Sequence, residues 1–458
     1  MKETLFVCQS CGATQPKWAG KCPACNAWNA LVEERAPKSR GRSRGIAVAD
    51  TAADVSIDAA LASEPERITS GLAEFDRVLG GGLVRGSVIL LGGEPGVGKS
   101  TLLLQAAAAI AGSEPVLYAS GEESAAQIAS RARRLGCGGA TQLRILPTGE
   151  LEAVEQAIPR TQPAVIAVDS VQTLRASDLE SAAGSVSQLR EVTARLVTLA
   201  KQQGRTVILV GHVTKDGSLA GPKVLEHLVD VVLAFEGQRS GGPRVLRAIK
   251  NRFGASGELC VMEMSRDGLR EVSDPSALFL AERPTDVPGS AVVASADGAR
   301  PLLLEVQALV TPTLAPSPRR VATGVDGTRL AILCAVLTQR ASLPLRDRDV
   351  FVSVAGGAAV EEPAADLAVA CAIASSVADL ALPSDLVVFG EIGLAGEIRA
   401  VPRCTPRLEE ALKLGFKRAL VPKANLERGE VPPGIIAHGV AHTRDVATWI
   451  ERKAAHRD

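Results

Sequence analysis

Aromatic side chains are scarce in this chain, which has eight Phe, three Trp and one Tyr among 458 residues. A protein that binds single strands by stacking successive bases on aromatic rings needs many such platforms, so the composition favours contact with the nucleic-acid backbone instead. An excess of charge is also missing, because 51 Lys and Arg balance 51 Asp and Glu. This balance excludes a global basic field and leaves any nucleic-acid contact to local patches.

Long apolar segments are absent as well. The first residues, MKETLFVCQSC, lack the apolar core of a secretory signal. The longest apolar-looking stretch, 367–382, is too short for a membrane span and carries Ser375, Ser376 and Asp379. We therefore expect a soluble, cytoplasmic protein without a membrane partner. A single core stops growing at about 250–300 residues, so we expect more than one domain.

Four of the nine cysteines lie close together near the start of the chain. They form two C-x2-C pairs separated by ten residues: Cys8, Cys11, Cys22 and Cys25. In a reducing cytosol such pairs indicate a Zn²⁺ site rather than disulfides, with a redox dithiol as the alternative. Four thiolates leave no open position for catalysis, so the predicted zinc is structural. We expect Trp18 and Trp28 to cover the metal, because a module this small has little other core.

The stretch VILLGGEPGVGKSTLLLQ, residues 88–105, joins an apolar strand, a glycine-rich loop and a Leu/Ala-rich helix. Its centre matches G-x-x-x-x-G-K-[ST], the phosphate-binding loop, in the context that separates this motif from a chance match. Glycines allow successive N–H groups to turn towards an anion, and the helix adds the positive end of its dipole. We expect Lys99 to contact the β- and γ-phosphates of ATP and Ser100 to hold Mg²⁺. The assigned nucleotide-binding residues are Gly93, Glu94, Pro95, Gly96, Val97, Gly98, Lys99, Ser100 and Thr101.

Residues 31–66 have the composition of a basic linker, since ERAPKSRGRSRG places five cations among Pro, Ser and Gly. Such a segment cannot bury enough apolar surface to order itself. It is either a solvated tether or an arm that contacts phosphates. From Arg67 the pattern changes, and RITSGLAEFDRVLGGGLVRGSVILLGG leads into the phosphate-binding loop. This lead-in and loop resemble the RecA-type ATPase core of recombinases, DnaB-like replicative helicases and circadian-clock ATPases.

The resemblance implies further catalytic residues. RecA-like ATPases carry an acidic residue at the end of the strand after the loop helix, where it polarises the attacking water. By that match Glu122 is the favoured base and Glu123 the second choice, and one of the two could instead only cap a helix. AVIAVDS, residues 164–170, is an apolar strand that ends in Asp. This is the Walker-B pattern, and Asp169 is expected to hold Mg²⁺.

The strand predicted at 206–210 ends in polar residues at a place where RecA-like cores approach the γ-phosphate. His212 and Thr214 are the sensor candidates, with a His bonded only to backbone partners as the alternative. The following segment occupies the place of a DNA-facing loop in that core. Lys215 and Lys223 are therefore candidates for contact with DNA phosphates.

A strand at 245–249 is followed by KNRFG, residues 250–254. KNRFG is the signature of the RadA (Sms) family of bacterial recombination ATPases, and this chain resembles that family here and in its zinc module before the core. Lys250 and Arg252 in a strand-end loop can be offered across a subunit boundary. There they would stabilise charge on the phosphoryl group of a neighbour's ATP. A solvated hairpin is the alternative.

Residues 286–458 resemble the C-terminal domain of Lon proteases, with elements expected near 302–309, 328–340, 349–355, 364–381, 386–390 and 407–421. In the place of Lon's D-G-P-S-A-G serine stretch, this chain has EEPAAD, residues 361–366, with Ala364 at the nucleophile. The place of the catalytic lysine falls at or near Thr405. Ser–Lys chemistry has thus lost both members. We expect an inactive scaffold that stacks subunits, with four candidates for DNA contact: Arg319, Arg320, Arg346 and Arg348.

We predict an α/β protein with a zinc module at 1–30, a linker at 31–66, a RecA-like ATPase domain at 67–285 and a Lon-protease-like domain at 286–458. The family resemblance implies a hexameric, DNA-dependent ATPase that moves on single-stranded DNA and promotes branch migration of recombination intermediates, with the recombinase RecA as a partner. Spacing alone supports a P-loop ATPase with a zinc module. The alternatives are a nucleotide-switched adaptor of a recombinase or replication protein, and an ATP-dependent serine protease.

Overall fold

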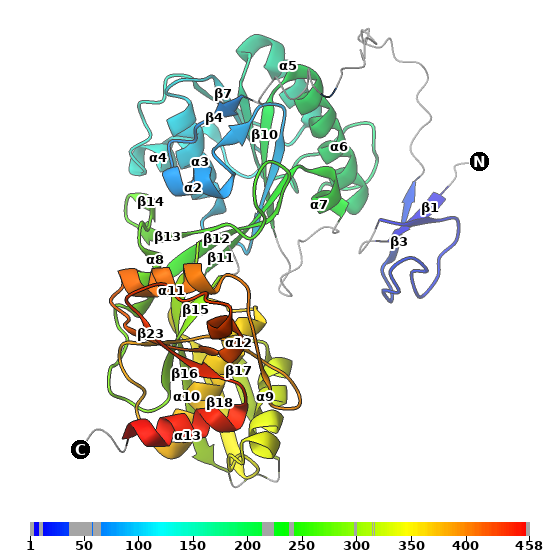
Figure 1. Cartoon of the computed structure of the whole chain (residues 1–458). Helices are drawn as coiled ribbons and strands as arrows, with labels where there is room; N and C mark the ends of the chain where they lie inside the picture. The colour runs from blue at the N-terminus through cyan, green and yellow to red at the C-terminus, as the bar shows by residue number, and fades with distance from the viewer. Residues whose placement is uncertain are drawn as a thin grey trace. The chain divides into compact units, whose positions relative to one another are not determined.

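The computed structural model describes residues 4–8, 12–35, 57, 66–212, 224–237, 242–296, 300–313, 315 and 317–454. The chain divides into two compact units, Met1–Glu271 and Val272–Asp458 (Figure 1). Most of the predicted linker lies outside the described residues, as do Cys11, Thr214, Lys215 and Lys223. None of the helices that the structure describes has the length and apolar composition to span a bilayer.

The first unit begins with a small antiparallel sheet in the order β2-β1-β3. Its strands are β1 (Thr4–Cys8), β2 (Thr14–Gln15) and β3 (Leu31–Arg35). A two-stranded ribbon, β4 (Arg67–Ile68) with β5 (Leu83–Val84), leads into the next sheet. Cys8 therefore ends β1, and Cys22 and Cys25 lie in the segment between β2 and β3.

The main sheet of this unit has nine strands in the order β14-β13-β12-β11-β6-β10-β9-β7-β8. Its parallel strands are β6 (Val88–Gly93), β7 (Val116–Ser120), β8 (Leu143–Pro147), β9 (Val165–Asp169), β10 (Thr206–His212) and β11 (Val231–Gly237). Three antiparallel strands extend it: β12 (Pro243–Asn251), β13 (Leu259–Ser265) and β14 (Gly268–Glu271). The order places β6 and β9 on either side of β10, so their carboxyl ends meet at one edge.

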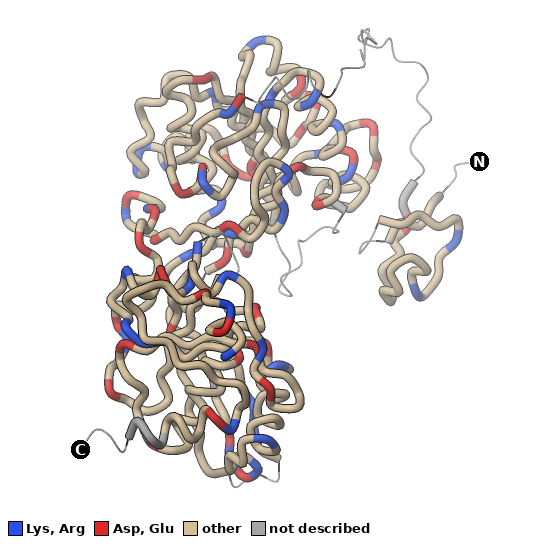
Figure 2. Tube along the Cα trace, viewed as in Figure 1, with Lys and Arg blue, Asp and Glu red and all other residues tan. Residues whose placement is uncertain are grey.

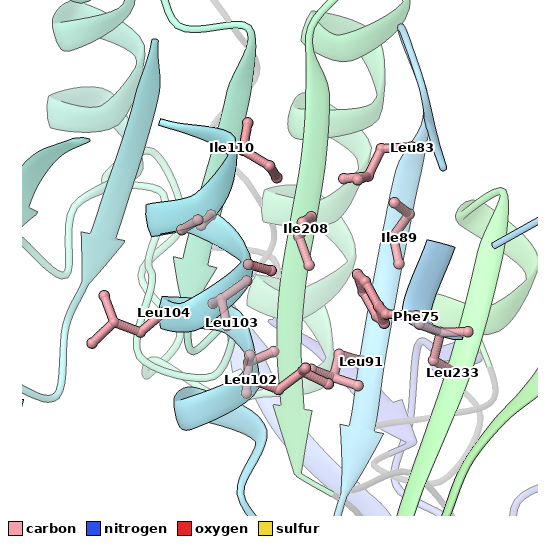
Figure 3. Packing of buried hydrophobic residues seen from close by; sticks show 14 of the residues in the cluster. Phe75, Leu83, Ile89, Leu91, Leu102, Leu103, Leu104, Ile110, Ile208 and Leu233 are labelled. Carbon is pink, nitrogen blue, oxygen red and sulfur yellow. The ribbon is translucent and has the colours of Figure 1, made fainter. Parts of the chain in front are cut away.

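Both faces of this sheet are covered, which accounts for the continuous apolar character of its strands. Ile89 and Leu91 of β6 face a cluster with helices α2 and α3 (Figure 3), whereas Val88 and Leu90 face a second cluster with α5 and α6. The helices are α2 (Ala73–Val78), α3 (Lys99–Ile110), α4 (Ala125–Arg134), α5 (Leu151–Thr161), α6 (Val186–Gln203) and α7 (Val224–Leu228). The alternation along one strand thus separates two hydrophobic cores.

The second unit contains a seven-stranded sheet in the order β17-β18-β16-β15-β19-β22-β23. Its strands are β15 (Ser290–Ser295), β16 (Leu302–Pro312), β17 (Arg320–Thr323), β18 (Arg348–Val354), β19 (Leu386–Val388), β22 (Arg418–Pro422) and β23 (Ile436–Val440). A short ribbon pairs β20 (Glu391–Ile392) with β21 (Ile398–Arg399). The helices are α8 (Pro275–Leu280), α9 (Gly327–Arg340), α10 (Asp366–Ala378), α11 (Cys404–Lys413), α12 (Lys423–Glu427) and α13 (Thr443–Ala454).

Helix α10 is buried from Asp366 to Ser375 on all its sides. A helix that is apolar all round has to lie inside a domain, and α10 packs against β15 and β16. The elements expected from sequence in this unit are all present, including the helix and strand near 407–421, which are α11 and β22. The observed α10 is shorter than expected because a 3₁₀ turn, Pro363–Ala365, precedes it and Asp379 ends it in a left-handed conformation.

A buried ion pair holds α11 to the segment before α10. The Arg407 guanidinium donates two hydrogen bonds, at 2.8 and 2.6 Å, to the two oxygens of Glu362, and a third to the Ala294 carbonyl. The side chain of Arg407 is 1% exposed. Burial raises the pKa of Glu362, but the hydrogen bonds and charge of Arg407 outweigh that effect and the net pKa is lowered. The pair therefore stabilises this unit only while Glu362 is ionised.

We predict that Glu362→Gln lowers the free energy of unfolding of the second unit by about 3–5 kcal/mol, because it leaves a buried guanidinium without a counter-charge. Urea unfolding can be followed by Trp449 fluorescence in a chain that carries Trp18→Phe and Trp28→Phe. The matched control is Lys413→Ala, which removes a cation with a 73% exposed side chain from the same helix.

Lowering the pH should change the difference in unfolding free energy between wild type and Glu362→Gln. The stability from the pair is present above the ordinary Glu pKa of 4.5 and is lost as the pH falls through the lower folded value. Wild type should therefore lose more stability than Glu362→Gln between neutral pH and pH values below that range. Equal acid sensitivity of the two chains would contradict this role of the pair.

Candidate functional site

The phosphate-binding loop connects β6 to α3, and its glycines are required by the backbone. Gly96 and Gly98 have φ values of 85° and 119°, which side chains rarely adopt. A Cβ on Gly93 would lie 2.4 Å from the Phe235 carbonyl oxygen of the neighbouring strand β11. The loop therefore makes a tight turn before Lys99, the first residue of α3, and the amino end of α3 faces the concave side of the loop.

Lys99 lies inside this curl and is buried. Its ammonium group donates hydrogen bonds to the carbonyl oxygens of Gly93 at 2.7 Å and Glu94 at 2.8 Å. Burial lowers the pKa of Lys99 to about 8, although the carboxylates of Asp169, Glu122 and Glu94 oppose the shift. An anion bound in the loop would add its negative charge to these carboxylates and favour the charged form of Lys99.

Ser100 and Asp169 meet beside the loop. The Ser100 hydroxyl donates a hydrogen bond to Asp169 Oδ1 at 3.1 Å, and Asp169 ends strand β9 in a buried position. A hydroxyl and a carboxylate oxygen at one point form a donor set that suits Mg²⁺, which prefers oxygen ligands and is bound by few protein groups. These two residues would hold the ion, which would neutralise charge on the β- and γ-phosphate oxygens.

The two acidic candidates after β7 have different partners. Glu122 accepts a hydrogen bond from the Ser170 hydroxyl at 2.6 Å, next to Asp169. Glu123 forms an ion pair with Arg131 of α4, with an N···O distance of 2.8 Å. The sequence left the choice between them open, and this geometry favours Glu122, because Glu123 is committed to a cation on the helix.

Strand β10 brings His212 to the loop, since His212 pairs in register with Gly93 of β6. The position next to the loop agrees with the sensor role expected from sequence, but the His212 side chain lies outside the described residues, as does all of Thr214. The role of His212 stays a prediction.

The KNRFG cations contact groups of their own chain. Lys250 donates hydrogen bonds to the carbonyl oxygens of Glu226 at 2.7 Å and Val229 at 2.8 Å, at the end of α7. Arg252 pairs with the buried carboxylate of Asp230 at 3.2 Å, while its side chain remains 54% exposed. Both cations are thus ordered on one edge of the first unit, and their predicted contact with a neighbouring nucleotide stays a prediction.

Three of the four predicted zinc ligands come together, and Cys11 lies outside the described residues. The thiols of Cys8, Cys22 and Cys25 lie within 4.8 Å of one another, and the sulfurs of Cys8 and Cys25 are 3.7 Å apart. Tetrahedral Zn–S bonds of about 2.3 Å place sulfurs about 3.8 Å apart, so the observed spacing fits zinc.

The expectation that Trp18 and Trp28 cover the metal was wrong. Their side chains are 57% and 73% exposed, and Leu31 instead packs against Cys8 and Cys22. Cys8 and Cys22 are buried and Cys25 is exposed. The partly buried side chains that pack against this cluster are Phe6, Ala13 and Ala30, so the two Trp rings are left on the surface.

Comparisons with known proteins agree with this organisation. Residues 6–33 match the family described as rubredoxin metal binding domain, residues 58–218 match the AAA domain, and residues 331–425 match subunit ChlI of Mg-chelatase. The protein called DNA repair protein RadA in Bacillus subtilis is 49% identical over 448 residues, which cover 97% of both chains. The chain belongs to the RadA family.

Two further RadA proteins show similar agreement. The Pseudomonas aeruginosa protein is 51% identical over 94% of this chain and 95% of its own. The Escherichia coli protein is 47% identical over 96% of each chain. Membership of the RadA family confirms the zinc ribbon, RecA-like ATPase core and Lon-like C-terminal domain that were expected from sequence.

The structure also shows site residues that the sequence did not indicate. Tyr118 donates a hydrogen bond to Asp169 at 2.7 Å, and Ser170 holds Glu122. Ser170 follows the Walker-B aspartate directly in the sequence, and this position could have identified it as a site residue. Tyr118 sits inside an apolar strand with no motif of its own, and only the pairing of β7 with β9 places its hydroxyl at the site.

We predict that Glu122→Gln lowers kcat for ATP hydrolysis by about 10²–10⁴-fold, which is the usual contribution of a general base. Nucleotide affinity should change little, because the amide keeps the side-chain shape. Turnover and fluorescent-nucleotide binding at saturating Mg²⁺ measure both quantities. Glu123→Gln is the matched control and should lose much less; the reverse order would make Glu123 the base.

We predict that Cys22→Ser releases one zinc per chain and unfolds the small β1–β3 sheet, because metal binding supplies about 10–16 kcal/mol to such modules. Metal analysis and circular dichroism check this. The scattered, buried Cys260 provides the control, since Cys260→Ser should keep the zinc. Full zinc content in Cys22→Ser would remove Cys22 from the ligand set.

Proposed function

We propose that this protein is a DNA-dependent ATPase of DNA repair and homologous recombination, acting in the cytoplasm as a ring on single-stranded DNA. One observation carries the catalytic part of this proposal. The Ser100 hydroxyl lies 3.1 Å from Asp169 Oδ1, while Glu122 is held 2.6 Å from the hydroxyl of the next residue, Ser170. These contacts bring the proposed metal-binding pair and the partner of the proposed base, Ser170, together at the phosphate-binding loop, which supports phosphoryl transfer to water as the reaction.

Each group has a distinct task in the proposed reaction. Lys99 and the loop N–H groups hold the β- and γ-phosphates, and Glu122 orients a water in line with the γ-phosphorus. The water oxygen bonds to phosphorus as the bond between phosphorus and the β–γ bridging oxygen breaks. The water proton passes to Glu122, and ADP and inorganic phosphate are the products.

The proposal places Lys250 and Arg252 at the seam between protomers, where they complete a neighbour's site. Two features support this. Arg252 stays half-exposed although it is ion-paired, and the contacts of Lys250 are to backbone carbonyls, which bind a cation without cancelling its charge. A cation presented by the next subunit typically raises hydrolysis by about 10³–10⁵-fold. A hexameric ring follows the family resemblance.

The proposed nucleic-acid partners are single-stranded DNA and branched recombination intermediates, and the proposed protein partner is the recombinase RecA. Lys and Arg are interspersed with Asp and Glu over the described parts of both units (Figure 2), which favours a few local phosphate contacts. Among the four candidate arginines, Arg320 donates to the carbonyls of Leu345 and Arg348, and Arg319 pairs with Asp349. Arg346 is exposed and is the better candidate for DNA.

The two alternatives make different predictions. A serine protease is disfavoured because the residue at the nucleophile's place, Ala364, is buried, and the Thr405 hydroxyl donates to the Glu430 carbonyl. A nucleotide-switched adaptor would hydrolyse ATP slowly and without response to DNA. Phosphate release measured with and without single-stranded DNA separates this adaptor from the proposed motor, and Lys99→Ala serves as the inactive reference.

A subunit-mixing experiment tests the seam directly. Arg252→Ala and Lys99→Ala should each be inactive alone, because one lacks the donated cation and the other lacks the phosphate-binding ammonium. In mixed rings, the Arg252→Ala subunit supplies an intact phosphate-binding loop and the Lys99→Ala subunit supplies an intact Arg252. The two meet in the productive order at about one seam in four, so about a quarter of wild-type activity should return. Co-assembled mixtures that recover nothing, although each variant is inactive alone, would show that Arg252 acts within its own chain.

The chain offers a matched control for Arg252. Lys201 also pairs with Asp230 at 3.2 Å, and its side chain is 51% exposed. Lys201→Ala removes the same kind of contact to the same carboxylate without removing a proposed seam cation. Lys201→Ala should keep near wild-type turnover. A loss as large as that of Arg252→Ala would show that both variants act by removing a counter-charge from the buried Asp230 carboxylate.

A further inference from the structure

The only tyrosine of the chain is attached to the Walker-B aspartate. Tyr118 is fully buried in β7, and its hydroxyl donates a hydrogen bond to Asp169 Oδ2 at 2.7 Å. The other oxygen, Oδ1, accepts from Ser100 at 3.1 Å. The two carboxylate oxygens are therefore divided between an anchor inside the fold and the side that faces the phosphate-binding loop.

A second side chain supports the anchor. Arg131 of α4 donates to the Tyr118 hydroxyl oxygen at 3.3 Å, lies 3.6 Å from Asp169 Oδ2 and pairs with Glu123 at 2.8 Å. Its helix is fixed at the amino end by a capping box between Ser124 and Gln127. A continuous set of polar contacts thus runs from Glu123 through Arg131 and Tyr118 to Asp169.

We propose that Tyr118 and Arg131 are positioning residues, which hold Asp169 so that Oδ1 is directed to Ser100 and the Mg²⁺ position, while Arg131 keeps Glu123 away from the attacking water. A carboxylate that could rotate freely would lose this division between its two oxygens. Partners behind a metal-binding side chain typically change metal affinity by about 10–100-fold when they are removed. This inference rests on the proposed ATPase function, but its test uses ADP and needs no turnover.

The first arm of the test measures the Mg²⁺ dependence of nucleotide binding in the full chain. Fluorescent ADP is titrated at a series of Mg²⁺ concentrations. Tyr118→Phe keeps the ring and removes only the hydroxyl, so the Mg²⁺ concentration for half-maximal binding should rise about tenfold. Arg131→Gln should shift it in the same direction. Binding at saturating Mg²⁺ should stay close to that of wild type.

Thr206→Val is the control for a purely structural effect. Thr206 is also buried in this sheet, and its hydroxyl donates to the Val84 carbonyl at 3.0 Å, but it lies at the opposite end of β10 from His212. Its loss should lower the melting temperature without changing the Mg²⁺ requirement. If Tyr118→Phe lowers the melting temperature and leaves the Mg²⁺ requirement unchanged, as this control does, the positioning role is overturned.

The second arm uses the fact that the chain has a single tyrosine. Incorporation of 3-fluorotyrosine gives one ¹⁹F resonance, which reports on position 118 alone. That resonance should shift when Mg²⁺ is added to the ADP-bound protein, and the shift should be lost in Asp169→Asn. A resonance that does not respond to Mg²⁺ overturns the inference. A normal ¹⁹F response in a protein that fails to hydrolyse ATP would overturn the hydrolase assignment and leave the positioning role standing.

Discussion

The contact between Ser100 and Asp169 is the constraint on which the rest of the first unit depends. The two residues are 69 positions apart in sequence, and their oxygens lie 3.1 Å apart. They meet because β6 and β9 flank β10 in a parallel sheet, so that the start of α3 and the end of β9 reach the same edge. Parallel strands of this kind need helices on both faces, and the two separate hydrophobic cores supply them. Ligand chemistry at such an edge is a consequence of strand order.

The sequence predicted those parts of the site that are encoded locally. The loop glycines, Lys99 and the strand before Asp169 follow short-range patterns. Tyr118 could not be predicted, because its role depends on the register of β7 against β9. The wrong expectation for Trp18 and Trp28 has a similar cause. Aromatic residues in a small module suggest a core, whereas Leu31 and Phe6, and not the two Trp rings, pack against Cys8 and Cys22.

In the second unit, which has a Lon-like fold, the places expected for the reactive Ser and Lys hold Ala364 and Thr405. The segment that carries the nucleophile in Lon-like proteases here supplies Glu362, which pairs with Arg407 in a nearly water-free setting. Ala364 and the buried part of α10, from Asp366 to Ser375, contribute packing. The fold of this unit was expected from its resemblance to Lon proteases, whereas the Arg407 pair could not be predicted, since its partners are 45 residues apart.

Asp230 gives the proposed seam an additional property. This buried carboxylate accepts a hydrogen bond from the Val88 amide at the start of β6 and is paired at once with Lys201 and Arg252, each at 3.2 Å. An isolated buried anion is costly, so a single partner could not leave without destabilising the strand that precedes the phosphate-binding loop. With two cations, Asp230 keeps one counter-charge when either partner is removed. Neither Lys201→Ala nor Arg252→Ala alone therefore leaves an unpaired buried anion beside the strand that precedes the phosphate-binding loop.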